Sequence, residues 1–307
     1  MLRVEIDMFS GRPNPVWIVT DENVTREVLD AVGETERATA KLGAGFTGLG
    51  FREVRVDVIA DDEPRRKGVP KQFALASTAA ADLKSSGVLA QRLIEAMPSR
   101  SEVQLAQHAV TPLTAQLRDL VLKRLSRFLA DPPRLRPPKP QRIPPNPLRT
   151  TINDGNCEKC QYEVSQFNPA FWNAAAVQPY NNCYNYGRNW RTDTFAQPGR
   201  AHGAQTGTMA CANVTGAAMA DGIRKRCDCL PQSEYPRRLM ALVIDPGWDY
   251  HWYRHQRGGF WGHKPGSTAA RNVDNSNALI VNPETCNRGG YTDFCGYFYA
   301  GRSVVIN

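Results

Sequence analysis

Hydrophobic and polar residues alternate in two stretches of the first half of the chain, at positions 2–7 (LRVEID) and 51–60 (FREVRVDVIA). A period of two is typical of a strand with one buried face. Both stretches are therefore predicted to be strands, and shorter apolar runs at 16–19 and 73–76 predict two more. The loop SGRPNP at 10–15 separates the first pair, and its glycine and prolines predict a turn.

Apolar residues in the same half also recur at the three-to-four spacing of amphipathic helices. One such run covers 21–32, where Asp21 is the expected N-cap, and a second covers 112–128. A helix is also predicted over 79–97, with an interruption at the Ser-Ser-Gly of 85–87. Strands and helices mixed in this way predict a small α+β domain over residues 1–130, with a binding role left open.

Residues 154–307 have a different pattern, with many Asn, Tyr, Trp, Gly and Cys and few Lys. Their apolar runs are short, which is typical of strands in an antiparallel sheet covered by a few helices. Helices are expected at 167–176 and 208–223. Strands are expected at 239–244, 250–255, 260–263, 278–281, 291–299 and 304–306. The chain as a whole is therefore predicted to be α+β.

A proline-rich basic segment, 131–153, lies between the two halves and has eight prolines between positions 132 and 147. Such a segment favours extended polyproline conformations and acts as a spacer. Residues 131–150 supply +4 of the net charge of +8. Because no aromatic residues are interleaved with these charges, we expect a solvated linker and no nucleic-acid partner.

The composition also bears on location. The N-terminus carries alternating charges and no apolar core of a signal peptide, and no apolar run is long enough to span a membrane. We therefore expect a cytoplasmic protein without a membrane span. Non-classical export, or a leader removed beforehand, stays open, as does the oligomeric state.

All eight cysteines lie at or beyond position 157. A cytoplasmic location favours free thiols or metal binding over disulfides. Cys157-x-x-Cys160 and Cys227-x-Cys229 are two closely spaced pairs that could together hold a structural zinc ion. Zinc, disulfides and free thiols all remain open for these four residues, and no catalytic metal or other cofactor is expected.

The candidate chemistry centres on Cys183, in the stretch QPYNNCYNY, and on two histidines in DYHWYRHQRGGFWGHKPG. His251 and His263 are placed symmetrically about the turn at 257–259. If this turn closes a hairpin, the two imidazoles face each other or nearly so, at the roughly 5 Å spacing of cross-strand neighbours. A thiol, a base and a group that orients the base are the parts of an activated cysteine nucleophile.

The roles follow from this chemistry. Cys183 would attack an amide carbonyl, His251 would accept the thiol proton and protonate the leaving amine, and His263 would fix the imidazole tautomer. Asp249 or Asp274 are the alternatives for this third position. The side chain of Gln178 or Asn181 would join the Cys183 amide in stabilising the oxyanion.

This order of a cysteine followed by two histidines on successive strands resembles the papain-like cysteine peptidases, in particular the NlpC-type amidase and peptidase branch. The resemblance covers about 85 residues, 178–264, and the usual Asp-Cys-Ser/Gly context is replaced by Asn182-Cys183-Tyr184. It implies a papain-like catalytic domain over 154–307 in which the cysteine begins a helix. It further implies a peptide or peptidoglycan-like substrate and a thioester intermediate.

The main prediction is therefore a cysteine-nucleophile hydrolase or acyl-transfer enzyme. Two alternatives remain open. The first is a non-enzymatic binding or structural module in which the cysteines form disulfides or a zinc knot and the histidines are packed. The second is an antibacterial effector or toxin that uses the same thiol chemistry.

Overall fold

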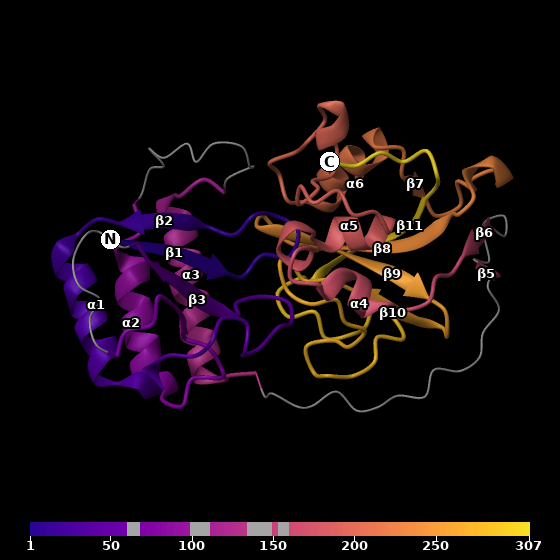
Figure 1. Cartoon of the computed structure of the whole chain (residues 1–307). Coiled ribbons are helices and arrows are strands. Elements are labelled where there is room, and N and C mark those ends of the chain that lie inside the picture. Colours follow the sequence, from indigo (N-terminus) through magenta and orange to yellow (C-terminus); the bar gives the residue numbers. More distant parts are fainter. Residues whose placement is uncertain (60–67, 99–110, 134–148, 153–159) are drawn as a thin grey trace. The chain divides into compact units, whose positions relative to one another are not determined.

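The chain is an α+β protein, as the sequence predicts, and its sheets are antiparallel. The computed structural model (Figure 1) describes most of the chain and leaves out four internal segments. The described residues are 1–59, 68–98, 111–133, 149–152 and 160–307.

The chain folds into two compact units. Unit 1 comprises residues 1–9 and 13–136, and unit 2 comprises residues 10–12 and 137–307. Most of the predicted linker lies outside the described residues. Its last part, Arg149–Ile152, forms strand β5, which pairs with β6.

Unit 1 is built on a four-stranded antiparallel sheet with the order β2-β1-β3-β4. The alternation in the sequence places Leu2, Val4 and Ile6 of the central strand β1 in the core, where none of them is exposed. The predicted strands all form, and their bounds are Leu2–Asp7 (β1), Val16–Val19 (β2), Glu53–Val58 (β3) and Gln72–Leu75 (β4).

The helices of unit 1 begin where side-chain caps are available. Asp21 accepts hydrogen bonds from the amides of Asn23 and Val24 at the start of α1. The expected interruption at 85–87 is wrong, because α2 runs through it: Ser86 is buried and accepts a hydrogen bond from the Ala76 amide, and Gly87 leaves room for the Leu129 side chain. The bounds are Glu22–Glu34 (α1), Glu36–Ala38 (η1), Leu83–Glu95 (α2) and Ala115–Ala130 (α3).

Buried charges join two strands of the unit 1 sheet. Asp7, on β1, lies 2.6 Å from the Arg52 guanidinium and 2.5 Å from that of Arg55. Arg55 also pairs with Glu53 at 3.0 Å. Burial by itself would raise the pKa of Asp7, but the two guanidiniums outweigh it and hold this pKa below its ordinary value.

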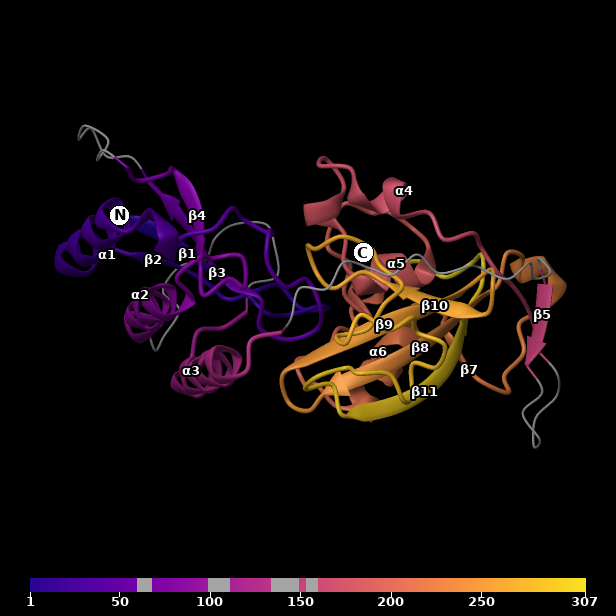
Figure 2. The ribbon, with the colours of Figure 1, turned by 90° about the horizontal axis from the view of Figure 1, so that it is seen from below.

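Unit 2 contains a five-stranded antiparallel sheet with the order β10-β9-β8-β11-β7. Figure 2 shows the long strands β9, β8 and β11 running side by side. Every residue of β8 after Arg238 is buried, which agrees with its apolar sequence. The bounds are Arg224–Lys225 (β7), Arg238–Asp245 (β8), Asp249–Gln256 (β9), Phe260–His263 (β10) and Asp293–Ala300 (β11), with Cys160–Glu163 (β6) pairing outside this sheet.

Short helices pack on the unit 2 sheet, and α5 contacts β9, β8 and β10. The strands expected at 278–281 and 304–306 do not form. Leu279 makes an isolated bridge to Val273, and Ile306 is buried as irregular chain. The helical bounds are Pro169–Asn173 (α4), Gln178–Tyr180 (η2), Cys183–Arg188 (α5), Arg200–His202 (η3), Cys211–Ala220 (α6) and Gln232–Glu234 (η4).

Candidate functional site

Cys183 is the first residue of α5. Asn182 caps this helix by accepting from the amides of Tyr184 and Asn185, and the Asn185 side chain accepts from the Asn182 amide in return. Such a reciprocal cap fixes the start of a helix, so the position of the thiol follows from the local sequence. The thiol itself is fully buried in the apolar core of unit 2, with its sulfur 3.9 Å from the Tyr250 carbonyl oxygen.

The environment of Cys183 disfavours the thiolate. Burial raises the pKa of the thiol well above its ordinary value, and the nearby Asp249 carboxylate raises it further, while Lys264 opposes this effect. The position at a helix N-terminus by itself makes a thiol more acidic. The desolvation cost of a completely enclosed thiolate is larger, and the shift therefore has the opposite direction.

The two histidines lie on β9 and β10 and contact each other directly. Nε2 of His251 is 2.8 Å from Nδ1 of His263, and Nε2 of His263 is 3.0 Å from the Val273 carbonyl oxygen. The carbonyl can only accept, so His263 Nε2 carries the proton and its Nδ1 accepts from His251. The strand pairing is displaced by two residues from the expected one, because His263 pairs with Tyr253.

Burial also decides the charge of His263. His263 is 1% exposed and stacks on the Tyr253 ring. Desolvation and the Arg271 charge lower the pKa of His263 to about 3. The imidazole is therefore neutral at physiological pH and serves as a packed hydrogen-bonding group.

The two acidic alternatives for the third position have other partners. Asp249 is buried and accepts hydrogen bonds from the amides of Ser10 (2.5 Å) and Arg12 (2.9 Å) and from the Tyr291 hydroxyl (2.5 Å). Burial raises the pKa of this carboxyl group, although these hydrogen bonds oppose the shift. Asp274 accepts from the amides at 276, 278 and 287 and so organises its own loop.

The segment Ser10–Arg12 belongs to unit 2. The sequence predicts a turn here, with a ligand-binding loop as the alternative, and neither identifies its contacts within unit 2. The amides of this segment donate to Asp249, and the Gly11 carbonyl accepts from the side chains of Asn182 (2.8 Å) and Gln197 (2.8 Å). A Cβ atom at Gly11 would overlap the Tyr250 ring. In the sequence, Gly11 followed by Arg12 indicates a turn. It does not reveal that the partner of this segment, Asp249, lies some 240 residues later.

The two predicted oxyanion donors bind protein acceptors. The Gln178 side chain donates to the Ser267 carbonyl at 3.2 Å, and the Asn181 side chain donates to the Val177 carbonyl at 2.9 Å and to Asp193 at 2.6 Å. The buried Lys264 ammonium donates to the main-chain carbonyls of both residues. These amides therefore hold the chain before α5 in place.

Of the four cysteines for which zinc, disulfides and free thiols were all left open, three are disulfide-bonded. Cys160 and Cys229 are bonded to each other with 5.1 Å between their Cα atoms, and Cys227 is also disulfide-bonded. Cys157 lies outside the described residues. Zinc needs thiolates, so this pairing contradicts a zinc site, and the residues that the structure describes contain no cluster of three or more metal-binding side chains.

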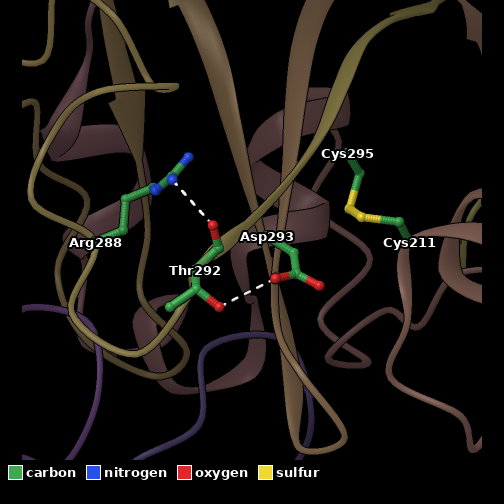
Figure 3. The surroundings of a disulfide bond; sticks show 5 residues. All are labelled: Cys211, Arg288, Thr292, Asp293 and Cys295. Atoms are coloured by element: carbon green, nitrogen blue, oxygen red, sulfur yellow. Dashed lines mark hydrogen bonds between the residues drawn. A yellow bond between two sulfur atoms is a disulfide. The ribbon is translucent and has the colours of Figure 1, made fainter.

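A second disulfide joins Cys211, at the start of α6, to Cys295 on β11 (Figure 3). Close to it, the Thr292 hydroxyl donates to Asp293 at 3.1 Å, and Arg288 donates to the Thr292 carbonyl at 3.3 Å. Among the described cysteines, Cys183 and Cys286 are free. Disulfides are uncommon in the cytoplasm, so the expectation of a cytoplasmic protein is wrong.

A cavity of about 530 Å³ in unit 2 was not anticipated from the sequence. Its lining includes Phe167, Phe171 and Trp172 from the α4 region, together with Asn189 and the buried guanidinium of Arg254. The aromatic residues alone are as common in cores as in binding sites. Only the fold brings the cationic side chain of β9 to the same place.

No helix in the described part of the chain is both long enough and apolar enough to cross a bilayer, in agreement with the expectation of no membrane span. No protein-family model matches the chain. No solved structure matches it either, and the papain-like resemblance therefore stays a prediction.

Among curated proteins, insoluble matrix shell protein 1 of Ruditapes philippinarum is 41% identical over 143 residues. The matched region covers 47% of this chain and 95% of that protein. A relative described as an insoluble matrix protein contradicts the prediction of a cysteine-nucleophile hydrolase, peptidase or amidase, and with it the toxin that would share this chemistry. Cys183 also lacks the accessible, acidic thiol that such chemistry needs. The relative favours the structural alternative.

Proposed function

We propose that this chain, which belongs to the family of insoluble matrix shell protein 1, is a non-enzymatic structural protein of an extracellular matrix. The observation that carries the proposal is the 41% identity over nearly the whole length of that relative. In this role unit 2 is a disulfide-stabilised module, and the partners are other components of the matrix.

The disulfides support an extracellular role. They link residues 69 and 84 positions apart in the sequence, and cross-links over such long loops restrict the unfolded chain strongly. An oxidising compartment is where such bonds form and persist. A protein that stays outside the cell for long periods benefits from this resistance to unfolding.

The packing around Cys183 supports a structural role in place of catalysis. The thiol, both histidines and Asp249 are at most 1% exposed, and their hydrogen bonds run to other parts of unit 2. A nucleophile must reach its substrate, whereas these side chains fix β9, β10 and α5 to one another.

The location is tested by fractionating the tissue that makes the protein. An antibody raised against the full chain should detect it in the extracellular residue that remains after detergent extraction. Recovery of the protein in the soluble cytosolic fraction would contradict the proposal.

The structural role is tested by alkylating the folded chain with iodoacetamide at pH 7.5 and mapping peptides without reduction. Cys183 should stay unmodified until the protein is unfolded, because its thiol is buried and its pKa is raised. The half-buried Cys286 is the internal control and should react first. Faster labelling of Cys183 than of Cys286 would speak for an activated nucleophile.

A further inference from the structure

The cavity beside α4 is lined by one buried cationic side chain, that of Arg254. Arg254 is 2% exposed and its guanidinium lies 4.3 Å from the centre of the Tyr186 ring. One terminal nitrogen donates to the Tyr186 carbonyl at 2.5 Å, and Nε donates at 2.9 Å to the Gln256 side-chain oxygen when that amide is oriented toward it. These contacts hold the planar group in one orientation, as binding an anion in a fixed geometry requires.

The charge of Arg254 is not neutralised by the residues around it. Among the described residues, no carboxylate pairs with Arg254, and its Nη2 nitrogen has no hydrogen-bond acceptor there. Burial lowers the pKa of this guanidinium to about 10, and it stays protonated at pH 7. A buried cation without an anion is costly, so the site favours a ligand that brings the negative charge.

The mouth of the cavity is aromatic and amide-rich. The Phe171 side chain is 44% exposed and packs edge-on against the buried Trp172. The Arg191 guanidinium lies 5.1 Å from the centre of the Phe171 ring. The side-chain amides of Gln166 and Asn189 also line the cavity, and no hydrogen bond engages them within the described part of the chain. The mouth therefore offers an apolar ring surface beside donors and acceptors that suit hydroxyl groups.

We infer that this cavity binds an acidic saccharide, with a carboxylate or sulfate of the sugar on Arg254 and a sugar ring against Phe171. Arginine binds planar carboxylates and sulfates through paired N–H donors. A pyranose ring has an apolar face of C–H groups and an edge of hydroxyls, which matches the aromatic surface and the amides. The cavity volume of about 530 Å³ lies within the usual range for small-ligand sites.

A saccharide fits these residues better than an acidic peptide does. An extended peptide is bound mainly through main-chain hydrogen bonds at an exposed strand edge, and the cavity is lined by side chains of the α4 region and of the internal strand β9. The inference depends on this cavity and not on the disulfides, so it can fail while the proposed structural role holds.

The test is calorimetric titration of the full chain with three probes at equal concentration. These are a hyaluronan hexasaccharide, which carries uronate groups, a heparin-derived hexasaccharide, which carries sulfates, and chitohexaose, which is uncharged. We expect at least one acidic probe to bind, and chitohexaose to bind at least tenfold more weakly. The two acidic probes distinguish carboxylate from sulfate recognition.

The variants locate the site. Arg254→Gln should weaken binding of the acidic probe by roughly a hundredfold, the range seen on truncating one partner of a buried charge pair. Phe171→Ala should weaken it about tenfold. Phe171 is exposed, so its replacement is a useful second variant if Arg254→Gln does not fold, and thermal unfolding of each variant shows whether the fold is retained.

A matched pair of controls lies in another cavity of similar size, about 570 Å³, lined by Arg226 and Phe294. Arg226→Gln and Phe294→Ala should bind like the original protein. The inference would be overturned if chitohexaose bound as tightly as the acidic probes, if none of the probes bound, or if the Arg254 and Phe171 variants kept full affinity. A fourth titration, with poly-aspartate, covers the peptide alternative, and its binding in place of the sugars would also overturn the inference.

Discussion

Unit 1 and unit 2 both fold around an antiparallel sheet, but different chemistry holds the two sheets. In unit 1 the buried carboxylate of Asp7 links β1 to the guanidiniums of Arg52 and Arg55, and no cysteine occurs before position 157. In unit 2, disulfides that include Cys160–Cys229 and Cys211–Cys295, together with a buried core rich in aromatic residues, hold the strands. Unit 1 should therefore be sensitive to acid and indifferent to reductant, and unit 2 should be sensitive to both.

The largest expected effect comes from removing the disulfide between Cys211 and Cys295. Replacing both with alanine should lower the free energy of unfolding of unit 2 by about 4 kcal/mol, because a loop of 84 residues is released in the unfolded chain. Denaturant unfolding followed by tryptophan fluorescence reports on unit 2, since five of the six tryptophans lie beyond position 160.

Replacing the free Cys286 with alanine is the control, and it should change the free energy of unfolding far less than the double substitution. Hydrogen exchange of the unit 1 peptides should be the same in all variants. If reducing the disulfides made the amides of β1 and β3 exchange faster, the proposed difference between the two units would be wrong.

The next effect is Asp7→Asn in unit 1, which should cost about 3 kcal/mol because it takes the charged partner away from the buried Arg52 guanidinium and removes one of the carboxylates that pair with Arg55. The folded-state pKa of Asp7 is lowered. Asp7 therefore contributes to the free energy of unfolding above its unfolded-state pKa of about 4, and this contribution is lost as the pH falls through its folded-state pKa. Acid titration followed by hydrogen exchange in β1 measures this loss. Asp57→Asn, on the same sheet but partly exposed, is the control and should change little.

The smallest effect concerns the pH dependence of unit 2. The pKa of His263 is lowered to about 3 by burial, so the folded state stays neutral while the unfolded chain binds a proton below about pH 6.5. Stability is then complete above pH 6.5 and falls toward acid, by about 1.4 kcal/mol between pH 7.5 and 5.5 for this one group.

His263→Gln should flatten that slope, whatever its effect on stability at pH 7.5, and denaturant midpoints at the two pH values measure it. An unchanged slope would show that His263 binds a proton in the folded protein about as readily as in the unfolded chain. As the pH falls, unit 2 should thus begin to lose stability about two and a half pH units above unit 1, which adds a second difference between the units.

Local signals in the sequence account for much of the fold. The alternation at 2–7 and the cap at Asp21 predict β1 and α1, and the apolar run at 239–244 predicts β8, because each depends on neighbours within a few residues. The register of β9 and β10 was missed by two residues, since the turn alone does not fix the pairing.

The candidate site shows where such reasoning ends. The proximity of His251 and His263 follows from the hairpin, but the burial of Cys183 does not, because it depends on strands and helices far away in the sequence. Disulfide connectivity cannot be deduced from spacing, and the pairing of Cys160 with Cys229 spans 69 residues. The contact of Asp249 with Ser10 is likewise invisible in either stretch alone.

The tripeptide Ser10–Arg12 makes unit 2 discontinuous in sequence. A protease cut or a gene truncation within the proline-rich segment would yield a fragment with every strand of the five-stranded sheet but without the three amides that bind the Asp249 carboxylate. Recombination that moves residues 137–307 alone therefore does not transfer the whole of unit 2, because residues 10–12 stay behind. Any lineage that carries this second half by itself has to supply those hydrogen-bond donors from new sequence.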